Sequence, residues 1–479
     1  MTCPVVELVT AAARRHPSRP AVTDGSGTWT YAQLFDEIRG WEVRLCGLGL
    51  PPGAVVALVS AASASLPVAF LGARRAGLVP LLADALHGDR HWAERATIGD
   101  AGAAVTVDDG AVSVRSASVA TLPSEAGYIA FSSGSQGHPK GIVGSAAGLA
   151  HFLAWERSRL GEAACGRVAQ LTSPSFDVAL RDMFLPLVSG GELVVAPRVI
   201  RSSPRAVLPW MRDNRIDVVH LVPSLSALWM DASGRRRGEK VAMPQLRFAV
   251  FAGEPLYSDH VARWREYAPN AAVLNLYGPT ETTLAVLCFD VPDRLADGLQ
   301  PVGEPLPDVD YSLEQQLDGG AQVIELRTPF GSLGYLPATA SADRGRLVRR
   351  DGVTIFRTSD LGYVDDHAQL VVTGRTDSLV KRRGVFIDLS AVESAARRLA
   401  GVHAACCVLV DPGRSARIVL LVAGPHNESV AALRRAIADV VGMDAFPDVI
   451  AAVDRLPELP SGKVDRRTVE TLARTLLTR

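Results

Sequence analysis

The 479-residue sequence has only six cysteines, and none of them belongs to a Cys-x-x-Cys pair. Cys406 and Cys407 are adjacent in an apolar, strand-like run, which favours a buried, reduced pair over a disulfide or a metal site. The N-terminal residues also lack a basic segment followed by an apolar one, so no secretory signal is predicted. Together these absences predict a cytoplasmic protein.

The sequence has no excess of charge of either sign. Its 50 basic and 51 acidic side chains leave a net charge of −1, which gives no electrostatic reason to expect nucleic acid or a membrane as a partner. It also lacks an uninterrupted apolar run of membrane-spanning length. The uncharged stretch Pro52–Ala73 contains Gly53, Ser60 and Pro67, which interrupt it. The stretch is therefore predicted to form a buried strand at residues 55–59, a turn and then a helix, and not a membrane span.

The first two thirds of the sequence alternates short apolar runs with amphipathic stretches, of which residues 5–16 and 31–48 are predicted helices. The apolar runs are continuous rather than alternating, which is typical of strands buried on both faces. The predicted strands cover residues 168–172, 193–196, 218–223, 248–252 and 273–276. The predicted fold class is therefore α/β, with a large N-terminal domain of helix-covered β-sheets.

The composition changes after Gly374, where a charged stretch covers residues 375–384. The elements predicted beyond it are a helix, two strands and a second helix, at residues 389–399, 404–410, 417–422 and 430–440. This pattern predicts a small C-terminal α+β domain of about 100 residues. We place the boundary at Asp377, which divides the chain into domains 1–376 and 377–479.

A glycine- and hydroxyl-rich segment, residues 128–141, follows a strand-like run and contains Lys140. Glycines let backbone N–H groups approach a phosphate, and serine hydroxyls and a lysine add donors and charge. The segment is not a Walker A loop, because His138 and Pro139 precede the lysine. Phosphate binding is therefore one interpretation, and a surface turn is the other.

This segment resembles the signature loop of the adenylate-forming enzymes, the superfamily of acyl-CoA synthetases, luciferases and peptide-synthetase adenylation domains. Other motifs of that superfamily have counterparts in the expected order, so the resemblance spans nearly the whole chain. The matching segments are Thr30–Leu34, Tyr277–Thr282, Thr358–Gly362, Gly374–Asp377 and Leu459–Arg466. The sequence is most similar to a stand-alone nonribosomal peptide synthetase adenylation domain.

The resemblance implies ATP and Mg²⁺ as cofactors and assigns a role to each matching residue. A carboxylate that attacks the α-phosphorus of ATP needs cations around the developing charge. The implied catalytic residues are Lys463, Thr280 and Glu281, the last of which would also hold Mg²⁺. The implied nucleotide-binding residues are Ser132, Ser133, Gly134, Ser135, Gly137, Lys140, Tyr277, Asp360 and Arg375. Asp377 is the implied hinge of a mobile C-terminal domain.

Two positions depart from the superfamily pattern. Ser359 stands before Asp360 where glycine is usual, but the carboxylate expected to accept the ribose hydroxyls is retained. Gln136 follows Ser135 where threonine is typical. Glutamine still forms hydrogen bonds, while the lost hydroxyl is expected to lower the rate.

Phe176-Asp177 resembles the peptide-synthetase motif whose aspartate binds the α-ammonium of an amino acid. A buried carboxylate is the expected partner, because an unpaired ammonium in a pocket is costly. The alternative is that Asp177 caps the helix predicted to follow it. The first interpretation narrows the substrate from a carboxylic acid to an amino acid.

The pocket implied by the resemblance leaves three substrate classes open. Its residues are Asp177, Val178, Arg181, His220, Val250, Ala252, Leu276, Leu284, Ala285 and Lys463. Several of them are similar to serine-activating domains, and several are compatible with proline activators. Arg181 fits neither, because a buried guanidinium favours a carboxylate or phosphate partner, which suggests an acidic amino acid. Its alternative partner is Asp182 or another acid of the protein.

The function implied is activation of an amino acid as aminoacyl-AMP and its transfer to a phosphopantetheine thiol. The chain ends about 16 residues after Lys463 and shows no carrier or condensation motif, so we expect a separate carrier protein as partner. Two other functions share the ATP motifs. These are an acyl- or aryl-CoA ligase, and a catalytically silent paralogue that binds a carrier or a nucleotide.

Overall fold

The computed structural model describes residues 3–85, 101–108, 112–114, 121–133, 139–234, 241–316, 322–336, 345–382, 385–397, 402, 404–410, 417–424, 435, 437–438, 446–458 and 464–477. The chain divides into two compact units. The first contains Met1–Pro223, Trp229–Ser312 and Glu325–Thr358, and the second contains Ser224–Leu228, Leu313–Ile324 and Ser359–Arg479. The division falls inside strand β20 (Val353–Val364), and the domain boundary at Asp377 stays a prediction.

The largest sheet of the first unit has nine strands among the described residues, in the order β15-β14-β13-β12-β11-β9-β10-β1-β2. The strands from β13 to β1 in that order are parallel to their neighbours. All five runs predicted as buried strands lie in this parallel part, which confirms them. The bounds are β1 (Pro20–Asp24), β2 (Gly27–Thr30), β9 (Arg167–Gln170), β10 (Glu192–Val195), β11 (Val218–Leu221), β12 (Phe248–Ala252), β13 (Ala272–Tyr277), β14 (Leu287–Val291) and β15 (Glu304–Pro305).

A second sheet of the first unit has seven strands in the described part of the chain, in the order β18-β8-β7-β4-β3-β5-β6. Alternate residues of β3 join different apolar clusters, Val56 and Leu58 one and Val55 and Ala57 the other, so both faces of the strand are buried. The bounds are β3 (Val55–Ser60), β4 (Val79–Asp84), β5 (Ala103–Thr106), β6 (Val112–Val114), β7 (Ala126–Ser133), β8 (Pro139–Ser145) and β18 (Gly334–Leu336).

The uncharged stretch that starts at Pro52 forms β3 and the helix α3 (Ser65–Arg75), as predicted. Across the described ranges, every helix is too short or too polar to cross a bilayer. The helix α3 packs closely against α2 (Tyr31–Cys46), because a Cβ added at Gly72 would lie 2.6 Å from the Cβ of Trp41. A larger residue at position 72 would therefore separate the two helices.

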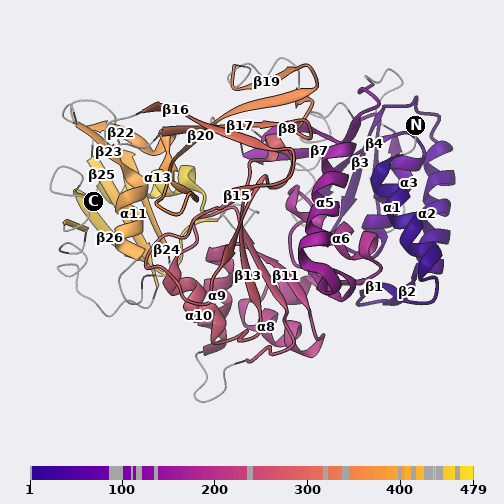
Figure 1. Cartoon of the computed structure of the whole chain (residues 1–479), viewed down its shortest axis with the longest axis horizontal. Coiled ribbons are helices and arrows are strands. Elements are labelled where there is room, and N and C mark those ends of the chain that lie inside the picture. The colour runs from indigo at the N-terminus through magenta and orange to yellow at the C-terminus, as the bar shows by residue number, and fades with distance from the viewer. Residues whose placement is uncertain are drawn as a thin grey trace. The chain divides into compact units, whose positions relative to one another are not determined.

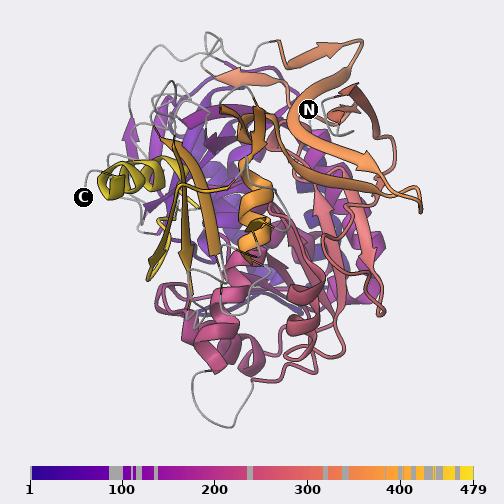
Figure 2. The same ribbon diagram turned by 90° about the vertical axis from the view of Figure 1, so that its left-hand side faces the viewer.

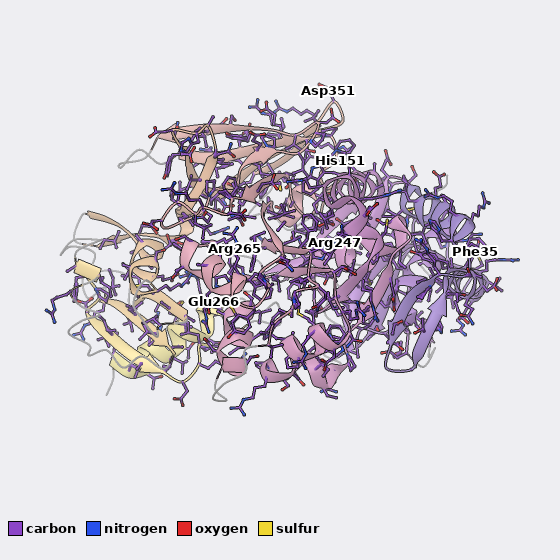
Figure 3. The ribbon with its side chains drawn as sticks, turned by 60° about the horizontal axis from the view of Figure 1, so that its bottom comes forward. Phe35, His151, Arg247, Arg265, Glu266 and Asp351 are labelled. Atoms are coloured by element: carbon purple, nitrogen blue, oxygen red, sulfur yellow. The ribbon has the colours of Figure 1, made fainter. Side chains whose placement is uncertain are left out.

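The helices α1, α2, α3, α5 and α6 of the first unit lie close together (Figure 1). The helix α2 begins with a capping box, in which the Thr30 and Gln33 side chains and backbone N–H groups satisfy each other. At the end of α10, Arg265 (Figure 3) donates to the three successive carbonyls of residues 291–293. The other bounds are α1 (Pro4–Arg15), α5 (Ala146–Leu160), η2 (Gly161–Cys165), α6 (Val178–Ser189), α7 (Arg198–Arg201), α8 (Pro204–Asp213), α9 (Pro223–Gly234), α10 (Ser258–Arg265) and η3 (Thr280–Thr282).

The strand β20 continues across the division between the units. In the first unit it pairs antiparallel with β19 (Leu347–Arg350), and in the second with β21 (Leu370–Arg375). The strands β16 (Asp310–Gln316) and β17 (Gln322–Thr328) complete the order β16-β17-β20-β19. The division between the units also falls inside α9, β16 and β17.

The second unit contains a β-sheet covered by helices on its two faces (Figure 2). Ala405 and Cys407 pack in the same apolar cluster as residues of α11, and Cys406 and Val408 in the same cluster as residues of α13. Both cysteines are buried free thiols, which confirms the expectation of a reduced pair. The bounds are η4 (Thr376–Ser378), β22 (Leu379–Arg382), β23 (Val385–Asp388), α11 (Leu389–Arg397), β24 (Ala404–Val410), β25 (Arg417–Ala423), β26 (Val449–Val453) and α13 (Arg466–Leu477).

The first predicted helix and both predicted strands of the C-terminal region are confirmed by α11, β24 and β25. The second predicted helix, residues 430–440, lies almost entirely outside the described residues.

Candidate functional site

Four predicted pocket residues lie on one face of the nine-stranded sheet. His220 is the register partner of Val250, and Ala252 is the partner of Leu276 on the next strand. Because side chains alternate along a strand, these four residues point to the same side. They stand near the carboxyl ends of parallel strands, where open α/β sheets commonly bind ligands.

The predicted pocket residues Leu284 and Ala285 join the same buried apolar cluster as Val250 and Leu276. The backbone that carries them is unusual, because Thr283 and Leu284 have φ angles of 71° and 62°. Left-handed φ is strained for a β-branched residue such as threonine, and such strain persists only where surrounding contacts enforce it. Here the Thr283 Oγ1 donates to the Phe330 carbonyl at 2.9 Å.

Two further contacts support this strained turn. The Phe330 ring stacks on His151 of α5 (Figure 3), with ring centroids 3.8 Å apart. A Cβ added at Gly278 would lie only 2.6 Å from the Cα of Ala285, so glycine at 278 allows the two segments to approach. The turn after the Tyr277–Thr282 motif is therefore held in place from both sides.

Asp177 stands at the N-cap of α6, and its Oδ1 accepts a hydrogen bond from the Val178 N–H at 2.9 Å. The helix-capping alternative is thus confirmed. The Asp177 carboxylate is also almost fully buried. Burial raises the pKa of Tyr128, and the charge of Asp177 raises it further, so the two side chains are close. The ammonium-binding role of Asp177 stays a prediction.

A buried ionic cluster lies beside the pocket face. The His220 Nε2 is 2.9 Å from the Glu156 Oε1, and its Nδ1 is 2.8 Å from the Asp182 Oδ1. The side chains of all three are at most 1% exposed. The Thr172 N–H donates to the other oxygen of Asp182. His220 therefore lies between a carboxylate of α5 and one of α6, and its hydrogen bond is to Glu156 on α5.

The cluster sets the protonation of His220. Burial and the nearby charge of Arg181 lower its pKa, while Glu156 and Asp182 raise it, and the net effect is a pKa above the ordinary value. The charged imidazolium is favoured because it stands between two carboxylates. Sequence reasoning named Asp182 only as a partner of Arg181 and missed Glu156, although Glu156 lies four residues from both Phe152 and Leu160 of the buried face of α5.

Arg181 follows Asp177 by four residues on α6, so the two share one face of the helix. Arg181 is buried, with a residue exposure of 3%. The expected alternative of an ion pair with Asp182 is wrong, because the Asp182 carboxylate contacts His220 and the Thr172 N–H instead. Within the described ranges, the Arg181 Nε–H has no hydrogen-bond partner.

The predicted phosphate and metal residues meet at Glu281. The Tyr335 hydroxyl donates to the Glu281 Oε1 at 3.0 Å. Desolvation raises the pKa of Glu281, while the bond from Tyr335 and the charge of Lys140 oppose that rise. Desolvation lowers the pKa of Lys140, Glu281 raises it and the charge of Arg346 lowers it. Glu281 and Lys140 therefore act on each other electrostatically, and Arg346 acts on Lys140.

Tyr335 and Arg346 were missed by sequence reasoning. Tyr335 reaches the site because β18 pairs with β8, where it lies opposite Ile142, two residues from Lys140. Long-range strand pairing of this kind leaves no local signal in the sequence.

Glu281 fits a magnesium ion that also binds substrate phosphates, because Mg²⁺ is commonly held by one or two carboxylates and completes its shell with phosphate oxygens and water. The part of the chain that the structure describes has no group of three or more metal-ligating side chains. The Glu281 carboxylate thus suits Mg²⁺ that is delivered with ATP.

In the second unit, the predicted ribose residue Asp360 is the cross-strand partner of Arg375. The Arg375 Nη1 donates to the Asp360 Oδ1 at 2.8 Å. The structure thus brings together two residues that were predicted separately to bind the nucleotide. The predicted hinge residue Asp377 follows in η4, and its side chain is outside the described set.

Several predicted residues cannot be placed in this way. Gly134, Ser135, Gly137 and Lys463 lie outside the described residues. Ser132 and Ser133 form the end of β7, and only their backbone is described. Tyr277 ends β13, and Thr280 begins η3 beside Glu281. The roles of all these residues stay predictions.

A model of the AMP-binding enzyme family matches residues 9–125 and 98–333, and the chain belongs to that family. It is an adenylate-forming enzyme. It is 29% identical to isonitrile lipopeptide synthase of Streptomyces coeruleorubidus over 98% of this chain and 33% of that protein. It is 28% identical to phenyloxazoline synthase MbtB of Mycobacterium tuberculosis over 96% of this chain and 34% of that protein. The chain thus spans about a third of these relatives.

The fold is shared with enzymes of more than one activity. A four-domain nonribosomal peptide synthetase bound to AMP and glycine matches with a TM-score of 0.82 at 21% identity, over 97% of this chain and 36% of that one. A benzoate CoA ligase from Burkholderia xenovorans also matches with a TM-score of 0.82 at 21% identity, over 98% of this chain and 100% of that one. These likenesses confirm the predicted fold class.

Proposed function

We propose that this chain activates an amino acid with ATP as aminoacyl-AMP and transfers it to the phosphopantetheine thiol of a carrier protein. The observation that carries the proposal is the buried carboxylate of Asp177, which stands at the head of α6 on the helix face that also carries Arg181. A buried carboxylate suits the α-ammonium of an amino acid. An aryl or fatty acid has no ammonium group that would need this carboxylate.

The first half-reaction joins two anions. An oxygen of the substrate carboxylate attacks the α-phosphorus of ATP, the new O–P bond forms, and the bond to the leaving pyrophosphate breaks. Lys140 and Arg346 lie near Glu281, where they offset charge on the phosphates. Mg²⁺ held by Glu281 would supply further charge stabilisation. Lys463 is proposed to bridge the substrate carboxylate and the phosphate.

The nucleotide is proposed to bind through Asp360, which accepts both ribose hydroxyls, and through Tyr277, which stacks on adenine. The hydrogen bond from the Arg375 Nη1 to the Asp360 Oδ1 orients the carboxylate as an acceptor. In the second half-reaction the carrier thiol attacks the aminoacyl carbonyl, and AMP leaves. Rotation of the C-terminal domain about Asp377 is proposed to separate the two half-reactions.

A CoA ligase is the second candidate, favoured by the likeness to the benzoate CoA ligase. It would use the same ATP residues but would leave the Asp177 carboxylate without a substrate cation. A CoA ligase should therefore keep its activity when Asp177 is neutralised.

The deciding experiment is pyrophosphate release from ATP, screened across the amino acids and a set of aryl and fatty acids. We expect release with one class of amino acid and its loss in Asp177→Ala, with Asp213→Ala, a substitution of an exposed aspartate on α8, as the matched control. Release only with a non-amino acid, unchanged in Asp177→Ala, would contradict the proposal. Mass measurement of added holo-carrier proteins tests whether the aminoacyl group reaches a separate carrier.

A further inference from the structure

Arg181 is buried, and no ion pair joins its guanidinium to an acid among the described residues. The residue is 3% exposed, and its Nε–H has no hydrogen-bond partner among the described residues. Burying an unpaired charge or donor is costly, and buried guanidinium groups therefore occur with anionic partners. A partner for Arg181 must come either from the protein or from a ligand.

The nearby carboxylates of Glu156 and Asp182 face His220, although Glu156 Oε2 and Asp182 Oδ1 have no hydrogen-bond partner in the described part of the chain. Glu156 and Asp182 both contact His220, at 2.9 and 2.8 Å, and Asp182 also accepts from the Thr172 N–H. With His220 as imidazolium, this triad carries a net charge of −1, spread over two carboxylates that already face a cation. The charge of Arg181 lowers the pKa of His220, so Arg181 lies close to the triad, although it forms no ion pair with Glu156 or Asp182.

A second buried polar side chain points to the same conclusion independently. Gln170 ends β9, and the pairing of Val218 with Val168 places Gln170 beside His220 on the neighbouring strand. It is fully buried, and neither the oxygen nor the nitrogen of its amide has a hydrogen-bond partner in the described part of the chain. Unsatisfied buried groups of this kind mark a place for a polar ligand or for water.

We infer that the amino acid activated by this enzyme carries a second carboxylate on its side chain, which pairs with Arg181. This inference rests on the proposed function. Asp177 and Arg181 stand one helical turn apart on the same face of α6, about 6 Å along its axis. A dicarboxylic amino acid would place its ammonium against the aspartate and its side-chain carboxylate against the arginine, with Gln170 available for a further hydrogen bond.

The same contacts decide against the two other substrate classes. A serine hydroxyl would need a free ring nitrogen of His220, but both nitrogens already contact protein carboxylates. Proline would fill the apolar part of the pocket and leave the Arg181 guanidinium buried without an acceptor. A side-chain carboxylate supplies the missing acceptor and a bidentate partner at once.

The test is amino-acid-dependent ATP–pyrophosphate exchange with the whole chain, using aspartate, glutamate, their amides asparagine and glutamine, serine and proline. We expect kcat/KM for one dicarboxylic amino acid to exceed that of its amide at least 100-fold. In Arg181→Ala we expect that preference to fall by at least 30-fold, and in Arg181→Lys to fall less, because a charge is kept without the planar fork. Arg205→Ala, at an exposed position of α8, is the matched control.

The outcomes separate the inference from the proposed function. Exchange with serine or proline alone, or a dicarboxylic preference that Arg181→Ala leaves unchanged, would overturn the inference and leave amino-acid activation intact. Exchange with no amino acid, while an aryl or fatty acid supports it, would overturn the proposed function itself. An ATP-dependent rise in the Tm of Arg181→Ala shows that the variant is folded.

Discussion

Arg466 donates from its Nη2 to both carboxylate oxygens of Glu393, at 2.7 and 2.8 Å. This pair joins the first residue of α13 to α11 within the second unit. Glu393 also accepts from the Cys407 N–H, and Arg466 donates to the Cys407 carbonyl. Since Arg466 follows Lys463 by three residues, the pair fixes the end of the segment that carries the predicted catalytic lysine.

Replacing Glu393 with alanine is expected to lower the free energy of unfolding by about 1–3 kcal/mol, because the buried side of the pair is lost. Chemical denaturation of the variant measures this. The matched control is Glu470→Ala, which breaks an exposed pair with Arg474 and should cost about 0.5 kcal/mol or less. Equal losses in the two variants would show that the Glu393 contacts add nothing specific.

Lys463→Ala is expected to abolish formation of the acyl-adenylate while leaving the fold intact, because a cation is removed from the developing negative charge. Pyrophosphate release measures the first property and Tm the second. Arg467→Ala, an exposed substitution on the same segment, serves as the control. Adenylate formed at the parental rate by Lys463→Ala would refute the catalytic assignment.

Tyr335→Phe removes the hydroxyl that donates to Glu281. Without that bond the ionised carboxylate is less stable, and a hydrogen bond to a charged group contributes about 1.5 kcal/mol or more. We expect the Mg²⁺ concentration that gives half-maximal pyrophosphate release to rise about tenfold. Tyr363→Phe, at an exposed tyrosine, should leave it unchanged. An unaltered Mg²⁺ dependence in Tyr335→Phe would argue that Glu281 does not hold the metal.

The His220 cluster predicts how stability depends on pH. The pKa of His220 in the folded protein is raised above the unfolded value of about 6.5. The stability that His220 contributes is therefore fully present below pH 6.5 and is lost as the pH rises through the folded-state pKa. In Glu156→Gln one carboxylate that raises the pKa is gone, and the loss should begin at lower pH. Tm measured between pH 6 and 10 for both proteins tests this, and parallel profiles would contradict it.

Local patterns in the sequence predicted five strands of the parallel sheet, while the residues on its pocket face were predicted from the resemblance to adenylate-forming enzymes. Continuous apolar runs such as 248–252 identify strands that are buried on both faces, and a period of two then places Val250 and Ala252 on the same side. At Asp177 the sequence left the capping and binding interpretations open, because both require the same residue at the same position. The capping bond of Asp177 was visible only once the helix was placed.

The sequence by itself determined the class of enzyme, because the motifs from residue 128 to residue 466 follow one another in the order that adenylate-forming enzymes share. The tertiary structure decided which charges are paired. Glu156, Asp182 and His220 are separated by up to 64 residues in the chain, and only the packing of α5 and α6 on the sheet brings them together. The same packing leaves the Arg181 Nε–H without a hydrogen-bond partner among the described residues. Ion pairing depends on distances of a few ångströms between side chains, which no local spacing in the sequence encodes.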